Sequence, residues 1–273
     1  MKIAYCLLAA MTLGVTSYAQ KGSDGVNEKM QKTISIGTDG VRIEDGNKKV
    51  KKDKAIDVTF ASLDVGINNL QDNSLYTSVA AKNFLQVPQT MQNSNLFDLR
   101  TGKSINVNLW PVLGKGRILK TSNQKIYLST GVGLQVYNFR YTNPVKYVNN
   151  PAPYVGLDSI SFRKDKLVVT YLSVPLQFTF KTRMVDKLWL VYGVGITGGY
   201  RISSYTKQVS DQRGKDKNPG NFNLNNFNST VTAEFGLDHY FRLYASYQLT
   251  NMYNDATGLD QHPFCIGLRF GGI

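Results

Sequence analysis

Alternation of apolar and polar residues is the dominant pattern along this chain. In the stretch 172–180, Leu172, Val174, Leu176, Phe178 and Phe180 are apolar, while serine, proline, glutamine and threonine lie between them. A period of two predicts a β-strand with one apolar and one polar face. In a soluble sandwich the apolar face turns inward, whereas in a membrane barrel it turns outward to lipid. The direction of this face therefore decides the class of protein.

Eight segments of this kind follow residue 56. They cover residues 57–66, 104–113, 125–139, 167–180, 188–202, 229–237, 241–249 and 263–270. The connections after the second, fourth and sixth segments are short, and the others are longer and rich in Asn, Gln, Gly and Lys. Long loops at one end and tight turns at the other are typical of an outer-membrane barrel. Glycine and glutamine fill the face opposite the apolar one, so the bulky face is predicted to meet lipid.

The predicted fold is all-β, an eight-stranded antiparallel up-and-down transmembrane β-barrel over residues 56–273. Residues 1–19 are an expected signal peptide, because Lys2 precedes a largely apolar stretch and Ser17-Tyr18-Ala19 fits the small-x-small cleavage pattern. An exported barrel of this kind is expected in the cell outer membrane. No stretch reaches the roughly 18–20 apolar residues of a spanning helix, which excludes a helical membrane protein.

Residues 20–55 are predicted to be a short extended N-terminal periplasmic arm. Asp39-Gly40 is a turn dipeptide between two β-prone runs, so the arm is a small hairpin or an extended segment. A run of five lysines follows at positions 48–54. It either rests on phospholipid headgroups or is simply solvated.

Several short motifs resemble a known family. Residues 171–176, Tyr-Leu-Ser-Val-Pro-Leu, are similar to the Tyr-Leu-x-Ile-Pro-Leu motif of the PorT-like family of outer-membrane barrels from Gram-negative bacteria. The glycine-spaced runs 131–134 and 192–200 and the final strand 264–270 resemble the same family. The resemblance implies an eight-stranded barrel of OmpA-like architecture, and one branch of the family is linked to protein secretion.

The chain departs from the pattern of these barrels at two points. Three residues follow Phe270, where such barrels tend to end on the terminal aromatic. Pro175 lies inside a strand, where a proline removes a ladder hydrogen bond. We therefore expect a β-bulge at Pro175.

Charge narrows the choice of partners. The formal net charge is +13, but an exported chain without a recognition motif gives no reason to expect nucleic acid. Outer-membrane lipid and lipopolysaccharide, whose phosphates are anionic, are the expected partners. Solvation of exposed segments is the alternative role of the lysines. The barrel-assembly machinery is a further expected partner, and other envelope proteins are candidates.

A group of charges is predicted inside the barrel. By parity Arg201, Glu234 and Arg269 point inward, and Asp64 joins them from a less regular strand. An eight-stranded barrel is just wide enough to be filled by side chains, and charges in so narrow a space must be paired or hydrated. The prediction is an ion-pair network that plugs the barrel, and a gated solute path is the alternative.

The sequence offers little catalytic chemistry. Cys265 is the only cysteine after the signal peptide, so neither an internal disulfide nor a cysteine metal site is expected. His262 lies two residues after Asp260, but a hydrolase there lacks an identifiable nucleophile. His239 follows Asp238 in a predicted turn. We expect no enzyme, no cofactor and no metal.

The predicted function is that of a non-enzymatic integral outer-membrane barrel with a structural or interaction role through its extracellular loops. The alternative is a component of a transport or protein-secretion assembly, either a porin-like small-solute channel or a PorT-like secretion factor.

Overall fold

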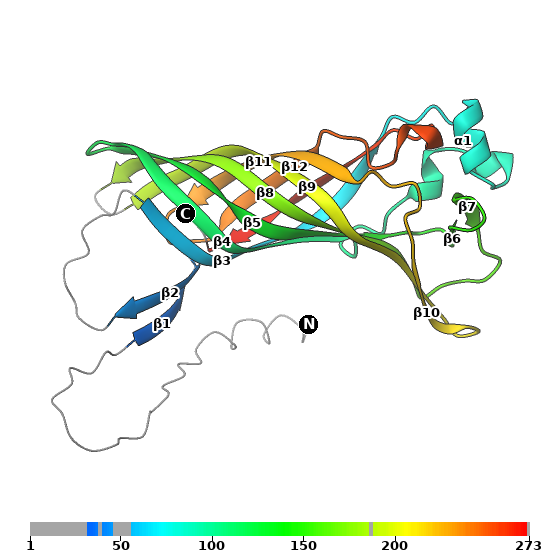
Figure 1. Cartoon of the computed structure of the whole chain (residues 1–273), viewed down its shortest axis with the longest axis horizontal. Helices are drawn as coiled ribbons and strands as arrows, with labels where there is room; N and C mark the ends of the chain where they lie inside the picture. The colour runs from blue at the N-terminus through cyan, green and yellow to red at the C-terminus, as the bar shows by residue number, and fades with distance from the viewer. Residues whose placement is uncertain (1–31, 38–39, 46–55, 186–187, 272–273) are drawn as a thin grey trace, which may run out of the picture.

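The chain folds into a closed antiparallel barrel (Figure 1). The computed structural model describes residues 32–37, 40–45, 56–185 and 188–271. The barrel strands are β3 (Ile56–Asp72), β4 (Ile105–Lys120), β5 (Gln124–Arg140), β8 (Lys164–Val185), β9 (Leu188–Ser210), β11 (Phe227–Leu237), β12 (Arg242–Gln248) and β13 (Gln261–Phe270). Each pairs with its neighbour in chain order, and β13 pairs with β3 over ten residue pairs. The predicted eight-stranded up-and-down β-barrel is confirmed.

A small hairpin precedes the barrel. β1 (Lys32–Gly37) pairs antiparallel with β2 (Gly40–Asp45), and β2 joins the barrel through the pair Val41 and Phe60 on β3. In Figure 1 the hairpin lies beside the end of the barrel that carries the C-terminus. The predicted signal peptide and the lysine run at 48–54 lie outside the described residues.

The two ends of the barrel differ in their connections. The connections that follow β4, β8 and β11 are short, and these strands end at the same end of the barrel. The connections 73–104, 141–163, 211–226 and 249–260 lie at the other end and carry structure of their own, which Figure 1 shows gathered there. They contain α1 (Val79–Phe84), η1 (Gln89–Met91), η2 (Ser94–Phe97), β6 (Val145–Val148), β7 (Tyr154–Leu157), β10 (Gly214–Pro219) and η3 (Asp255–Thr257). Within the described residues, no helix has the length and apolar character needed to cross a membrane.

The hydrophobic core sits at the long-loop end rather than in the barrel. It is a cluster of buried side chains from all four long connections and from the adjoining ends of β5 and β8, here called the aromatic cap. Its members include Phe84, Leu85, Leu96, Phe97, Tyr137, Phe139, Tyr141, Val145, Tyr147, Val155, Leu167, Val169, Phe222, Leu224, Met252, Tyr253 and Leu259. Sequence analysis did not predict that the long connections share a core.

Local irregularities reset the inward and outward alternation of the strands. Ala61 on β3 has a φ of 60°, and the facing strand β4 carries a register shift between Leu109 and Val112. Thr59 is buried and Phe60 exposed before this point, whereas Ser62 is buried after it. An extra residue in a strand moves every later side chain to the other face. This explains why the alternation of the first strand looks irregular in the sequence.

The prediction of a bulge at Pro175 is wrong. The pairing of β8 with β9 runs through Pro175 and Thr197 without a shift, and the shift occurs instead between Thr170 and Tyr171. On the β5 side, pairing continues in one register from Thr130 and Leu176 to Gly133 and Ser173, with no ladder pairs between them. The missing N–H of proline therefore interrupts the ladder without displacing it.

Candidate functional site

The outer wall of the barrel is apolar on every strand. Leu172, Val174, Leu176 and Phe178 are 41–53% exposed, and Phe180 is partly exposed. Their counterparts elsewhere on the wall form with them what we call the apolar belt: Val65, Ile67, Leu109, Val112, Val132, Val194, Ile196, Val231, Phe235, Leu243 and Ile266. The residues between them on β8 are buried and polar, such as Ser173 and Thr179.

Aromatic pairs bound the apolar belt at both ends. Phe180 stacks on Tyr192 toward the short turns, with ring centroids 5.3 Å apart. Tyr200 meets Phe227 edge to face toward the long loops, with centroids 5.1 Å apart. Tyr192 and Tyr200 are eight residues apart on β9, which is about 27 Å along a strand. At a tilt of 35–45° this becomes roughly 20 Å of barrel height, close to the ~25 Å apolar band of membrane barrels.

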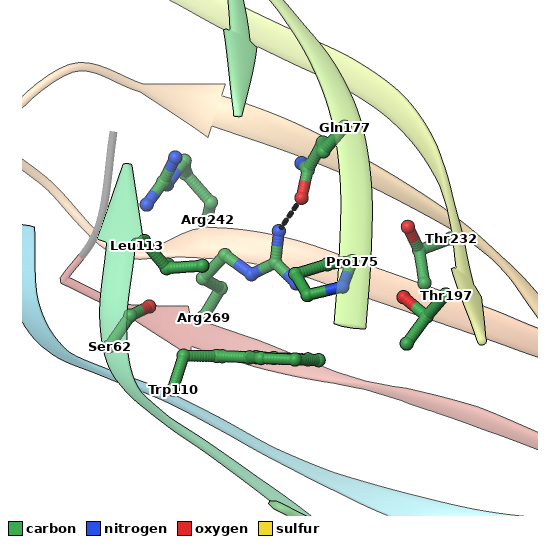
Figure 2. Close-up of a pocket in the computed structure, with 9 residues that line it drawn as sticks. All are labelled: Ser62, Trp110, Leu113, Pro175, Gln177, Thr197, Thr232, Arg242 and Arg269. Atoms are coloured by element: carbon green, nitrogen blue, oxygen red, sulfur yellow. Dashed lines mark hydrogen bonds between the residues drawn. The ribbon is translucent and has the colours of Figure 1, made fainter. Parts of the chain in front are cut away.

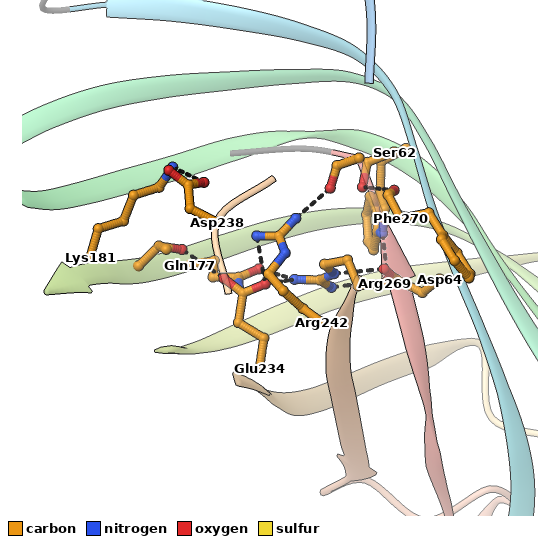
Figure 3. A network of polar contacts seen from close by, with 12 residues as sticks. Ser62, Asp64, Gln177, Lys181, Glu234, Asp238, Arg242, Arg269 and Phe270 are labelled. Atoms are coloured by element: carbon orange, nitrogen blue, oxygen red, sulfur yellow. Dashed lines mark hydrogen bonds and ion pairs between the residues drawn. The ribbon is translucent and has the colours of Figure 1, made fainter. Parts of the chain in front are cut away.

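Inside the barrel, two carboxylates and two guanidinium groups form one buried cluster (Figure 3). Arg269 from β13 binds Asp64 of β3 through two bonds, Nε to Oδ1 at 2.6 Å and Nη2 to Oδ2 at 2.9 Å. Glu234 Oε2 on β11 lies 3.2 Å from Arg269 Nη1 and 3.1 Å from Arg242 Nη1. All four side chains are at most 6% exposed. The charges alternate along the row and sum to zero, which is how buried ions are kept stable.

Neutral donors and acceptors complete this ion-pair cluster. Trp110 Nε1 donates to Asp64 Oδ2 at 2.9 Å, and Thr179 donates to Glu234 Oε1 at 3.0 Å. Arg269 Nη1 also donates to Gln177 Oε1 at 2.7 Å. Buried charges need such additional bonds to offset their lost hydration. The cluster therefore links six of the eight strands across the barrel.

The structure brings three of the four charges expected in the interior together and places the fourth elsewhere. Asp64, Glu234 and Arg269 meet in the ion-pair cluster. The expectation that Arg201 joins them is wrong, because its guanidinium bonds to the 221–226 loop, including the Asn225 carbonyl oxygen at 3.1 Å. A register shift beside Arg201 marks the rim of the barrel. The fourth member is Arg242, whose inward parity was visible in the sequence although its contact with Glu234 was not.

Little space is left beside the cluster. Figure 2 shows a cavity bordered by Trp110, Pro175, Gln177, Arg242 and Arg269, among others. Its volume is about 10 Å³, which is the room that one water molecule needs. The large Trp110 side chain on β4 packs over Gly133 on β5, where a Cβ atom would collide with the indole. The described interior is a packed polar core at this level.

The two histidines do not form a catalytic constellation in the described residues. His262 Nδ1 lies 3.0 Å from the Gln248 carbonyl oxygen and Nε2 lies 2.8 Å from Asp260 Oδ1. Its ring stacks on Tyr247. His239 sits exposed in the short turn with a φ of 67°, beside Asp238. Among the described residues, no group of three or more His, Cys, Asp or Glu side chains could hold a metal.

The aromatic cap lies at the long-loop end of the barrel. The hydroxyl groups of Tyr141, Tyr147 and Tyr253 form a buried chain, with O–O distances of 2.6 Å and 2.7 Å. Burial raises the pKa of each of these tyrosines, so the chain is neutral at physiological pH. Asp165 lies under the cap and is 4% exposed. Burial raises the pKa of its carboxyl to about 7.

The fold and its interior define the chain as an eight-stranded antiparallel barrel with an apolar outer wall, a charge-paired core and a structured mouth. Comparison with protein-family models and with curated proteins finds no match. The resemblance to the PorT-like family stays a prediction.

Among solved structures, the chain is similar to Ail, the attachment invasion locus protein of Yersinia pestis, alone and in complex with the heparin analogue sucrose octasulfate. Both matches are 10% identical and cover 78% of this chain and 98% of that chain, with TM-scores of 0.27 and 0.25. Values this low support no inference about this chain, whose fold rests on its own strand pairing.

Proposed function

We propose that this chain is a non-enzymatic integral outer-membrane protein that acts through its structured long-loop end. The observation that carries the proposal is the inversion of polarity, with an exposed apolar belt outside and a buried ion-pair cluster inside. A soluble barrel of this size would aggregate through such a wall. In a membrane the same wall is solvated by lipid, and closure leaves no unpaired sheet edge.

The ion-pair cluster and the aromatic cap favour an interaction role over a solute channel. A solute would have to displace charges that are paired to one another and to cross a core with room for about one water molecule. The long connections instead share a core that holds them in one shape at the mouth. Ordered loops on a rigid scaffold are the usual place for binding residues.

Two measurements test this proposal. The purified full-length protein should migrate faster on a detergent gel when unboiled than when boiled, and it should give no stepwise conductance in a planar bilayer. Migration that does not change on boiling would reject the membrane barrel. Large conductance steps would reject the plugged interior and favour a small-solute channel.

A role in a secretion assembly is a second proposal, favoured by the β1–β2 hairpin. The hairpin extends the sheet beside β3 by one residue pair and lies at the short-turn end, which faces the periplasm in this orientation. Photo-crosslinkers placed in the hairpin of the full-length protein in cells should capture secretion partners if this role is correct. Their absence alongside efficient control crosslinks would favour the structural role.

A further inference from the structure

A row of cationic residues crosses four adjacent strands beyond the apolar belt. Strand pairing aligns Arg140 on β5 with Lys166 on β8, Lys166 with Lys207 on β9, and Lys207 with Lys217 on β10. Residues that are directly opposite in a sheet point to the same face. Lys164 and Lys215 lie two residues further along, on either side of Val209, and share that face. We call these six residues the cationic ridge.

The face of the ridge is the outer one. Its opposite face carries Asp165 and Thr206, both buried, whereas Lys215 and Lys217 are exposed and Lys166 and Lys207 partly so. β8 and β9 have 22 and 23 residues, about twice the 9–11 that a membrane strand needs. At the level of the ridge the sheet consists of β5, β8, β9 and β10, and only β8, β9 and β10 continue to Lys164 and Lys215. The protein thus presents these charges on a regular sheet rather than on loose loops.

In the described part of the chain, the ridge lysines are not ion-paired with the acidic residues near them. Asp216 lies between Lys215 and Lys217 on β10 but pairs with Gln208, so it belongs to the opposite face. Asp211 pairs with Arg163 at 3.2 Å and Asp158 pairs with Arg213 at 2.5 Å. Within the described residues, none of the five lysine ammonium groups of the ridge forms an ion pair with a carboxylate. Lys166 Nζ donates instead to the Asn138 amide oxygen at 2.5 Å. The ridge is therefore a concentrated positive surface.

This arrangement is unfavourable in the protein alone. Like charges directly opposite one another on a sheet destabilise the pairing. Partial burial, together with the charges of Lys164, Lys207 and Arg140, lowers the pKa of Lys166 to about 8. The charge of Lys215 is the main cause that lowers the pKa of Lys207. Lysines spread over the surface would keep the protein equally well solvated. The alignment of the ridge lysines on neighbouring strands therefore points to an anionic ligand.

We propose that the cationic ridge binds a saccharide that carries several phosphate or sulfate groups, laid across the strands. The strands that carry these cations are about 4.8 Å apart, so the row extends over several strands and suits a chain of anionic sugars better than a single anion. Tyr205, which pairs with Val168 and Pro219 on the same face, has Lys217 Nζ 4.0 Å from its ring centre. Lys217 covers one face of this ring, and no aromatic residue is among the six residues of the ridge. The ridge therefore lacks the series of aromatic platforms typical of single-stranded nucleic-acid sites, which favours a saccharide.

The height of the cationic ridge above the membrane limits the possible sources of its ligand. This step rests on the proposed outer-membrane location. Lys207 is seven residues beyond Tyr200 of the rim, which is up to about 24 Å along the strand and up to about 18 Å in height after tilt. That is beyond headgroup phosphates at the interface and level with phosphorylated sugars that project from a glycolipid. A soluble sulfated saccharide carries the same chemistry.

The test compares two double variants of the full-length protein in detergent. Lys207→Gln/Lys217→Gln removes two ridge charges, and Lys82→Gln/Lys103→Gln removes two exposed charges from the first long connection. Binding of a sulfated heparin-type oligosaccharide is measured by calorimetry at low and moderate salt. We expect the ridge variant to bind at least tenfold more weakly and the control variant less than threefold, with recovery in Lys207→Arg/Lys217→Arg. Equal losses in the ridge and control variants would overturn the site.

Three further arms complete the design. Vesicles containing lipopolysaccharide should compete with the oligosaccharide if the natural source is a glycolipid, and their failure to compete would assign a soluble saccharide. A DNA duplex that binds as tightly, with the same dependence on the ridge, would overturn the saccharide assignment. Unchanged heat-modifiable migration of every variant shows that a loss of binding is not a loss of fold, and it separates failure of this inference from failure of the proposed location.

Discussion

Replacing Glu234 with glutamine tests whether charge pairing holds the barrel interior together. Its carboxylate lies 3.1 Å from Arg242 Nη1 and 3.2 Å from Arg269 Nη1. At an effective dielectric constant of about 20, each attraction is worth roughly 5 kcal/mol before hydration is counted. Glutamine keeps the shape but leaves a net charge of +1 among the buried groups. Measured losses on breaking buried pairs are about 3–5 kcal/mol, and we expect that loss here.

The assay is urea unfolding of the protein in lipid vesicles, followed by tryptophan fluorescence and by the loss of heat-modifiable migration. Trp110 is a suitable reporter, because it is 2% exposed and donates to Asp64 within the cluster. Asp211→Asn is the matched control, since the Asp211–Arg163 pair is 69–82% exposed. Removing a surface pair of this kind should change stability by less than about 1 kcal/mol.

A double variant separates charge balance from packing. Glu234→Gln/Arg242→Gln returns the cluster to net zero, so it should recover at least half of the stability lost in Glu234→Gln. A loss below about 1 kcal/mol in the single variant would refute the reasoning. So would a double variant that is no more stable than the single one, because the effect would then come from shape rather than from charge.

Three other predictions follow from the interior and the cap. Gly133→Ala should destabilise the barrel by about 1–3 kcal/mol through collision with Trp110, whereas Gly198→Ala, with open space at its Cβ position, should have little effect in the same urea titration. The pKa of Asp165 in the folded state is raised to about 7, so between about pH 4 and pH 7 the folded state keeps a proton that the unfolded state loses, and stability falls as pH rises through this range. Asp165→Asn should remove this fall and raise thermal stability at pH 8. An unchanged pH profile in the variant would contradict this prediction. Tyr147→Phe breaks the middle of the tyrosine chain, and an unpaired buried hydroxyl costs about 1–3 kcal/mol; limited proteolysis should cut the long connections faster while the barrel stays heat-modifiable.

Strand number and loop asymmetry were predictable from the sequence because they depend on local patterns. Alternation in each segment marks a strand, and the length of each connection can be counted directly. The same reasoning identified Asp64, Glu234 and Arg269 as inward residues. It depends only on parity, which is unbroken around Glu234 and Arg269, whereas Asp64 lies three residues after the irregularity at Ala61.

The remaining features depend on events that alternation does not reveal. A residue such as Ala61, with its positive φ, shifts the phase of a strand without any signal from proline or glycine. Arg201 keeps the inward parity of β9, but it lies eight residues beyond Gly193, which pairs with Glu234. Parity gives the face of the sheet and not the level along the barrel, so Arg201 lies at the rim and not in the cluster. The aromatic cap has no periodic signal in the sequence, because its loop residues occur in ones and twos among polar residues. Val155, Phe222 and Met252 meet only through contacts far apart in the chain.

The shared core of the long connections has a consequence for how the protein reaches its final state. Because all four connections contribute to the aromatic cap, it cannot assemble until the last of them is in place. In the proposed outer-membrane location, the connections would cross the bilayer before their apolar side chains are buried together. Burying a side chain such as Phe222 is worth about 1.5–3 kcal/mol. Formation of the aromatic cap after insertion would therefore oppose withdrawal of the strands from the membrane.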